Sequence, residues 1–211
     1  RGSVLSDEIK TTRNNINDDE VTFENAWGIC DEDIFNKMLK VADVQYKTGK
    51  PFFNFIMTTS NHRPFTYPSG KIYIPSGTSR EGAVKYTDFA LKELFKKAST
   101  KPWFKNTVFV IIADHCASSA GKDEIDVANY HIPAFIVNLP EQYNQKIDKQ
   151  CSQIDLWPTL FSIFHWDYES DFFGKNVLDP KFEERALMGT YRKLVLMKKE
   201  KVMILSDQKK Q

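Results

Sequence analysis

The chain has 211 residues, of which 41% are hydrophobic, enough for one sizeable core or for most of one larger domain. Its 29 basic and 28 acidic residues leave a formal charge of +1, which argues against a nucleic-acid partner and against recruitment by an anionic membrane. No run of apolar residues reaches the roughly 18 that a membrane-spanning helix needs, and the first residues lack a signal-peptide pattern.

The first 24 residues are polar and aperiodic, so they predict an irregular lead-in, with the remaining residues 25–211 forming one domain. Because the chain opens on Arg1–Gly2–Ser3 without a Met, we expect it to be an excised part of a longer protein. A helix is predicted after Asp31, which we interpret as its N-cap. Its apolar positions follow helical spacing, at Ile34, Phe35, Met38, Leu39 and Ala42.

The apolar run 51–59 predicts a strand buried on both faces, and it leads directly into Ser60–Asn61–His62. His62 would therefore lie just beyond the carboxyl end of that strand. Residues 68–78 predict a loop that could overhang the site, and residues 80–99 predict an amphipathic crossover helix. Four lysines of this helix are interpreted as a solvated face rather than a binding patch, namely Lys85, Lys92, Lys96 and Lys97.

A second apolar run, residues 107–113, predicts the strand around which the chain is organised, and it ends in Asp114–His115. In open α/β sheets, ligands bind beyond the carboxyl ends of the strands. A carboxylate and an imidazole at this edge offer one hard oxygen and one borderline nitrogen to a divalent cation. The alternative is an Asp that caps the next turn beside a solvated His.

Residues 116–130 contain no evident crossover helix, so the strand predicted at 133–138 should return antiparallel. That return would bring His131 close to Asp114 and His115. If the strands from residues 51 and 107 are parallel neighbours, His62 opens onto the same crevice, and three of the four histidines converge. The fourth, His165, follows an apolar helix predicted at 154–164 and is interpreted as structural.

Three short strands are predicted near the carboxyl terminus, at 186–189, 193–196 and 201–205. They suggest an antiparallel meander whose edge is protected by lysines, including Lys201, Lys209 and Lys210. Cys116 and Cys151 could meet near one sheet edge and form a disulfide; the alternative is two small buried thiols.

Several motifs, taken in order, resemble the sulfatase-type phosphoglycerol transferases, which include the lipoteichoic acid synthases and lie within the alkaline phosphatase superfamily. The resemblance covers most of residues 25–180. Its elements are Trp27–Gly28 to Asp33, Phe52 to Phe65, Tyr86–Thr87–Asp88, Ile111 to His115, His131–Ile132–Pro133, Gln153–Ile154–Asp155 and Pro158–Thr159–Leu160.

The resemblance implies an α/β fold of the alkaline phosphatase and sulfatase type, with a mixed, mostly parallel sheet flanked by helices and the antiparallel meander at the end. It also implies a metal-dependent transferase, using Mn or Zn, that moves phosphoglycerol or a similar phospholipid headgroup onto an extracytoplasmic glycan or lipid acceptor. Asp114 and His115 match metal ligands, His62 matches a histidine that contacts the phosphoglycerol, and His131 is a candidate for either role.

In the resembled family the nucleophile is a Thr, preceded by a further metal carboxylate, and both come from an amino-terminal half without counterpart here. Thr58, Thr59 and Ser60 are interpreted as hydrogen-bonding residues, not as nucleophiles. We therefore expect the carboxyl-terminal part of an extracytoplasmic enzyme, inactive alone and tethered to the membrane through residues outside this chain. A sulfatase or phosphatase of the same superfamily and a non-catalytic domain that binds anionic headgroups are the alternatives.

Overall fold

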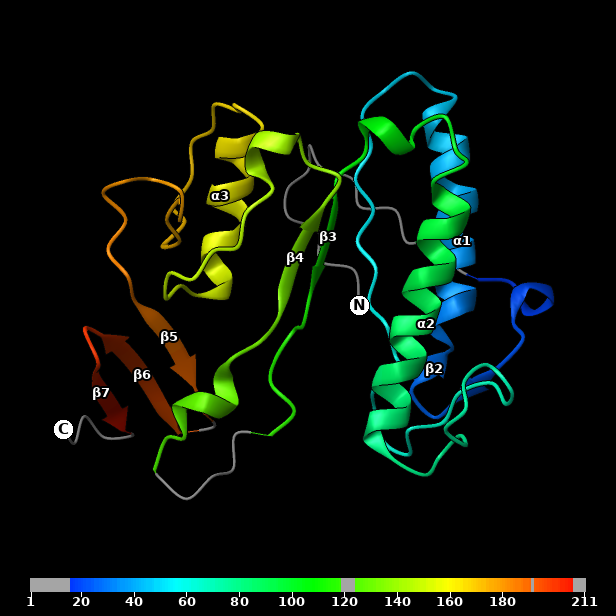
Figure 1. Cartoon of the computed structure of the whole chain (residues 1–211), viewed down its shortest axis with the longest axis horizontal. Coiled ribbons are helices and arrows are strands. Elements are labelled where there is room, and N and C mark those ends of the chain that lie inside the picture. The colour runs from blue at the N-terminus through cyan, green and yellow to red at the C-terminus, as the bar shows by residue number, and fades with distance from the viewer. Residues whose placement is uncertain (1–15, 119–123, 191, 207–211) are drawn as a thin grey trace. The chain divides into compact units, whose positions relative to one another are not determined.

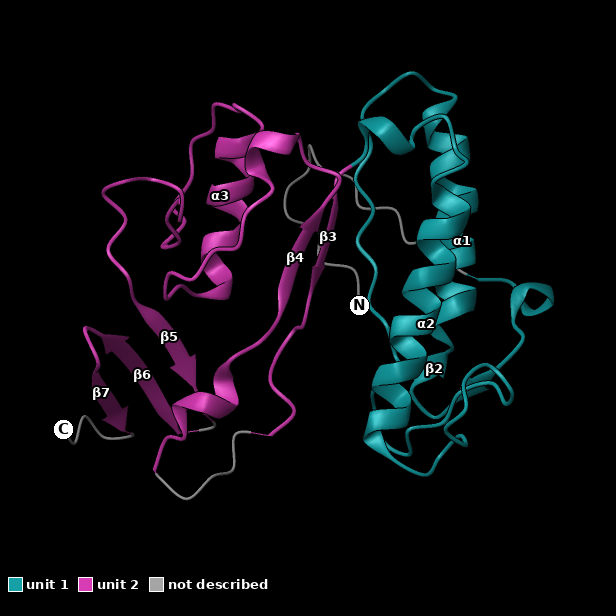
Figure 2. Cartoon of the chain, in the orientation of Figure 1, with its two compact units in different colours: residues 1–107 teal, residues 108–211 magenta. Residues whose placement is uncertain are grey.

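A computed structural model describes residues 16–118, 124–190 and 192–206 (Figure 1). The chain divides into two compact units, residues 1–107 and residues 108–211 (Figure 2). The greater part of the predicted lead-in, residues 1–15, lies outside the described residues, as do Lys209 and Lys210. Within the described residues, no helix combines the length and apolar character that crossing a membrane requires.

The first unit is built on two long helices that pack side by side, α1 at Asp31–Tyr46 and α2 at Arg80–Ala98 (Figure 1). Two-residue strands, β1 at Glu24–Asn25 and β2 at Gly28–Ile29, pair antiparallel before α1. Short 3-10 helices occupy Asp18–Glu20 and Phe104–Asn106. Both predicted long helices are confirmed, because each has a stripe of apolar residues with a period near 3.6 that its partner can cover.

The beginning of α1 corrects one prediction. Cys30 is the N-cap residue, and Asp31 is the first helical residue, with its side chain fully buried. Its carboxylate binds residues 59 and 60 and the side chain of Thr87 rather than the free N–H groups of its own helix. The predicted apolar face is otherwise present, since Phe35, Leu39 and Ala42 are buried.

α2 begins at a capping serine and buries the face that its periodicity predicts. The buried side chains include Ala83, Tyr86, Ala90 and Leu94. Tyr86 stacks on Tyr67, with ring centroids 5.0 Å apart and planes 8° from parallel. The two tyrosines form the core of the unit together with Cys30 and Ala83.

Substitution of Ser79 with Ala should lower the free energy of unfolding by about 1 kcal/mol, because the Ser79 side chain accepts a hydrogen bond from Gly82 N at 3.1 Å. Ser99→Ala is the matched control at the other end of α2, where the exposed hydroxyl donates only to Lys96 O. We expect the control to change stability by less than about 0.5 kcal/mol in urea denaturation. Equal losses in both variants would contradict a capping role for Ser79.

The predicted strand at 51–59 is not formed. These residues are extended, but they have no strand assignment, and alternate side chains are exposed, with Phe53 at 68%, Phe55 at 76% and Met57 at 65%. An apolar run predicts burial, yet a strand also requires a neighbouring backbone as hydrogen-bonding partner, and the run does not encode that partner.

The second unit contains α3 at Leu156–Ile163 and five strands within its described residues. β3 at Phe109–Ile112 pairs antiparallel with β4 at Ala134–Val137, as predicted. The predicted meander is also confirmed, in the order β5 at Ala186–Gly189, β6 at Lys193–Lys198 and β7 at Lys201–Ser206. Short 3-10 helices lie at Val127–Tyr130, Glu141–Tyr143 and Gln153–Asp155.

Two further expectations are not met within the described residues. Every strand pair there is antiparallel, so the mostly parallel sheet is not present in this part of the molecule. Parallel pairing joins segments that are distant in the chain, and neither apolar run specifies such a neighbour. Cys116 and Cys151 are free thiols, so the proposed disulfide is not formed.

Candidate functional site

His62 lies in a turn of the first unit that follows the extended segment 51–59. Its backbone N–H donates to Thr59 O at 3.2 Å, and its carbonyl accepts from Phe65 N at 2.7 Å. The imidazole is partly exposed and stacks on the Trp27 indole, with centroids 3.9 Å apart and planes 13° from parallel. Trp27 Nε1 also donates to Arg63 O at 2.5 Å. The turn therefore presents His62 to solvent in one defined orientation.

The hydroxyl groups near this turn are engaged in structural hydrogen bonds. Thr59 Oγ1 donates to Ile29 O at 2.6 Å, and Ser60 Oγ donates to the Asp31 carboxylate at 2.8 Å. Ser60 is also buried, at 1% exposure. These contacts agree with the interpretation of Thr59 and Ser60 as hydrogen-bonding residues rather than nucleophiles.

Asp114 and His115 follow β3 in the second unit, and their side chains face each other. Asp114 Oδ2 lies 3.4 Å from His115 Nε2, and both side chains are about 70% exposed, at 70% and 69%. His115 Nδ1 lies 2.6 Å from the carbonyl oxygen of Cys116. A carbonyl can only accept, so Nδ1 donates this hydrogen bond, and in the neutral tautomer with the proton on Nδ1 the lone pair that could bind a cation is on Nε2.

The backbone at Asp114 is held by the 3-10 helix Gln153–Asp155, which precedes α3. Gln153 Nε2 donates to Ala113 O at 3.0 Å and to Asp114 O at 3.1 Å. Asp114 Oδ1 accepts from the backbone N of His115 at 2.9 Å. Secondary contacts of this kind orient metal ligands and select their tautomer. Gln153 lies in a motif shared with the resembled family, but no role is predicted for it, because a side-chain amide in a sequence does not indicate its partner.

His131 begins the segment that enters β4. The antiparallel register pairs Ile112 with Ala134, and Ala113 N donates to Pro133 O at 3.3 Å. If this register continued for two further residues, residue 131 would lie opposite residue 115, but the described pairing ends at the bond between Ala113 and Pro133. His131 is exposed, and no cluster of three or more His, Cys, Asp or Glu side chains suited to a metal occurs within the described residues. Asp114 and His115 are thus the pair of donors that the structure brings together.

The four candidate residues divide between the two units. His62 belongs to the first, whereas Asp114, His115 and His131 belong to the second, so their convergence at one edge stays a prediction. His165 is exposed and lies two residues beyond the end of α3, where its backbone N donates to Ser162 O at 3.1 Å.

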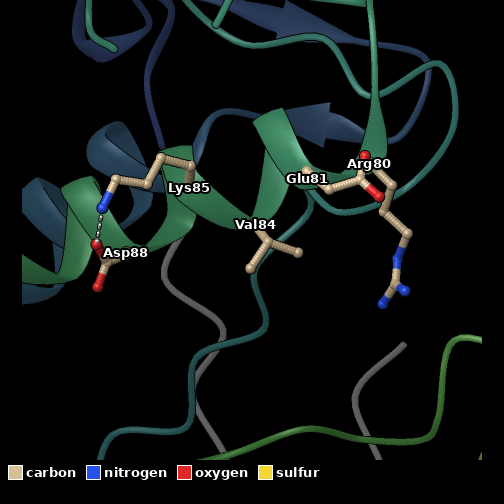
Figure 3. Close-up of a pocket in the computed structure, with 5 residues that line it drawn as sticks. All are labelled: Arg80, Glu81, Val84, Lys85 and Asp88. Carbon is tan, nitrogen blue, oxygen red and sulfur yellow. Dashed lines mark hydrogen bonds and ion pairs between the residues drawn. The ribbon is translucent and has the colours of Figure 1, made fainter. Parts of the chain in front are cut away.

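An open hollow of about 430 Å³ lies along α2, and none of the residues that line it is a candidate site residue (Figure 3). It is lined by Arg80, Glu81, Val84, Lys85 and Asp88, and Lys85 Nζ pairs with Asp88 at 2.9 Å. A single helix provides the whole lining, and two of its charged residues, Lys85 and Asp88, pair with each other. This open lining and its ion pair are consistent with the interpretation of Lys85 as part of a solvated face.

Known structures define the class of fold. A protein of the alkaline phosphatase superfamily from Vibrio parahaemolyticus matches with a TM-score of 0.82 and 34% identity, over 90% of this chain and 47% of that one. The lipoteichoic acid synthase LtaP from Listeria monocytogenes matches in fold with a TM-score of 0.65 and 21% identity, over 92% of this chain and 55% of its own. The chain thus has the fold of the alkaline phosphatase superfamily.

Within that class, the Sulfatase family model matches residues 5–166, and the chain belongs to this family. Lipoteichoic acid synthase-like YvgJ of Bacillus subtilis is 26% identical over 72% of this chain and 28% of its own length. Phosphoglycerol transferase I of Citrobacter koseri is 29% identical over 46% of this chain and 13% of its own length. The chain therefore spans less than a third of these curated relatives.

Proposed function

We propose that this chain is the carboxyl-terminal part of a metal-dependent transferase that moves phosphoglycerol, or a similar phospholipid headgroup, onto a glycan or lipid acceptor. The observation that carries the proposal is the Asp114–His115 pair, an oxygen donor beside an imidazole whose Nε2 is free to bind a cation. Family membership and the printed names of the relatives support the same reaction class.

The donor set fits a divalent cation of the Mn or Zn type. Carboxylate oxygen suits Mn, and imidazole nitrogen suits Zn, so the pair provides two ligands of a site that needs at least two more. When bound, the metal would lower the pKa of the nucleophile and neutralise charge on the phosphoryl oxygens. Asp114 and His115 hold the ion in this proposal, and His131 adds a ligand or a substrate contact.

In this proposal His62 binds the substrate, and residues outside this chain provide the nucleophile, a further metal ligand and the membrane tether. His62 is partly exposed and fixed in orientation, which suits a side chain that binds a phosphoglycerol headgroup through a hydrogen bond. The Thr nucleophile and a further metal carboxylate are assigned to a part of the enzyme not included here. We place the domain on the extracytoplasmic side of a membrane, with the tether outside this chain.

Calorimetric titration of Mn and Zn into this chain tests the metal site. We expect saturable binding by the wild type and an affinity lower by roughly 10-fold or more in Asp114→Asn, because the amide is a weaker ligand than the carboxylate. His131→Ala reports whether that residue is a ligand. His165→Ala is the matched control, because its exposed imidazole lies outside the proposed site and its removal should leave the affinity unchanged.

A folded wild-type chain that binds neither metal would contradict a site held by this chain's own residues. The same titration on the full-length protein would then show whether ligands from elsewhere are indispensable. Equal binding by wild type and Asp114→Asn would contradict the assignment of Asp114 in either protein.

Substrate assays separate the transferase from a true sulfatase or phosphatase, a second candidate that the family name itself favours. The full-length protein should turn over a glycerophosphodiester faster than a phosphomonoester or an aryl sulfate, and the 211-residue chain should be inactive alone. Preference for the aryl sulfate would favour a sulfatase. Headgroup binding without turnover of any of the three would favour the non-catalytic alternative.

A further inference from the structure

The first residue of α1 carries a buried charge with an unexpected set of partners. Asp31 is 0% exposed, and a buried carboxylate is tolerated only when hydrogen bonds replace its lost hydration. Its Oδ1 accepts from Thr59 N at 3.1 Å, Ser60 N at 3.1 Å and Ser60 Oγ at 2.8 Å. Its Oδ2 accepts from Thr87 Oγ1 at 2.7 Å. Three of these four bonds come from the two residues that begin the His62 turn.

The contacts of Asp31 continue along the backbone to His62. The His62 N–H donates to Thr59 O, which belongs to a residue that Asp31 holds. Thr87 Oγ1, besides donating to Asp31, lies 3.3 Å from Asn61 Nδ2 and accepts its hydrogen bond. The three residues that precede His62 are therefore each held by Asp31 or by Thr87.

The opposite side of the turn is fixed by Trp27. Its ring stacks on the imidazole, its Nε1 donates to Arg63 O, and its own backbone N donates to Asn25 Oδ1 at 2.8 Å. The indole is anchored to the residue that follows His62, so a displacement of the turn backbone would disturb the stack. The position of the imidazole against the indole therefore reports whether the turn is still held in place.

We propose that Asp31 is the positioning residue of His62: its buried carboxylate fixes the turn 59–65 so that the imidazole faces the headgroup in one orientation. The part of this inference that concerns headgroup binding rests on the proposed function, whereas the orientation of the ring does not. Asp31 touches no substrate in this account and acts only through His62.

NMR on the 211-residue chain tests the orientation of the His62 ring. The measured quantity is the chemical shift of its ring protons. The stacked indole shields them, and Trp27→Leu marks their shift when the stack is absent. In Asp31→Ala we expect the shift to move most of the way to that of Trp27→Leu. Asp31→Asn should restore most of it, because its amide oxygen still accepts from residues 59 and 60 and its NH₂ can donate to Thr87 Oγ1.

Asp43→Ala is the matched control on the same helix. Asp43 accepts from Trp103 Nε1 at 2.8 Å and pairs with Lys101, far along α1 from residue 31. Its loss should lower stability without moving the His62 shift. If Asp31→Ala does not fold, Ser60→Ala removes one of the four bonds to the Asp31 carboxylate, together with the bond from Asp31 N to Ser60 Oγ, and should move the shift in the same direction by less. An unchanged shift in the folded Asp31 or Ser60 variants would overturn the proposal.

Kinetics of the full-length protein then separate this inference from the proposed function. We expect Asp31→Ala and His62→Gln each to lower kcat/KM by roughly 10-fold or more, and the double variant to be no worse than His62→Gln alone. A displaced ring with unchanged kcat/KM in both single variants would refute the substrate role of His62 and leave its positioning by Asp31 intact. Additive losses would overturn the claim that Asp31 acts through His62.

Discussion

Replacing Arg185 with Ala should lower the free energy of unfolding of the second unit by about 3–5 kcal/mol, because it leaves a buried carboxylate without its cation. Arg185 Nη1 and Nη2 each donate to one oxygen of Asp155 at 2.7 Å, and the Asp155 side chain is 1% exposed. The same carboxylate accepts from Ser152 N at 2.8 Å and Lys175 N at 2.7 Å. One buried charge thus joins the start of α3, the loop at 175 and the entry to β5.

Urea denaturation of the wild type and the variant measures this loss. Lys198→Ala is the matched control, since it removes a cation from the exposed pair with Glu183 in the same unit. Exposed pairs contribute little, so its denaturation midpoint should stay nearly unchanged. Similar midpoints for Arg185→Ala and Lys198→Ala would contradict the importance of the buried pair.

The contribution of this pair should also depend on pH. Burial raises the pKa of Asp155, but hydrogen bonds from Arg185, Ser152 and Lys175 outweigh it and leave the pKa below its ordinary value. A carboxyl whose folded pKa lies below its unfolded pKa adds stability above the unfolded value, and this is lost as pH falls through the folded value. The difference between wild type and Arg185→Ala should therefore be constant near neutrality and shrink below about pH 4.

A single added methyl group at Gly174 should cost about 3 kcal/mol, because the space beside its Cα is already filled by backbone. A Cβ at this position would lie 1.9 Å from Ile154 O and 2.7 Å from Ile154 C. The Ile154 carbonyl, in the 3-10 helix that precedes α3, cannot rotate away as a flexible side chain could. The loop at 174 would move instead and break the bond from Lys175 N to Asp155.

Gly189→Ala provides the control for Gly174→Ala in thermal and urea denaturation. Gly189 lies in β5 of the same unit, and the nearest atom to its added Cβ would be Lys193 O at 3.9 Å. This variant should change stability by no more than about 0.5 kcal/mol. Equal losses of stability in both glycine variants would contradict a steric conflict specific to Gly174.

Much of the fold follows from local patterns in the sequence. α1 and α2 are encoded by apolar stripes, with Gly49 and Pro51 after the first and Ser79 before the second. The pairing of β3 with β4 and the meander of β5, β6 and β7 follow from connections that contain no crossover helix. The ordered motifs also identify the family, since they lie mostly within the residues that the family model matches.

Features that depend on distant partners were not predictable in this way. The run 51–59 has the composition of a buried strand, yet it is unassigned and half of its side chains face outward. Asp31 has the sequence context of an N-cap, but its carboxylate binds residues 28 or more positions away. The composition of a segment indicates whether its side chains can be buried or form hydrogen bonds. It does not indicate which other segment of the chain will pack against it or pair with it.

The sequence by itself determined the residue types of the candidate site, with Asp114 and His115 placed at the end of a strand and His62 after an apolar run. Only the tertiary structure decided which His115 nitrogen is available, that Gln153 holds the backbone at Asp114, and that Asp31 and Trp27 orient His62. The physical reason is that helical and strand periodicity are properties of neighbouring residues, whereas hydrogen-bond partners are chosen among groups that only folding brings together.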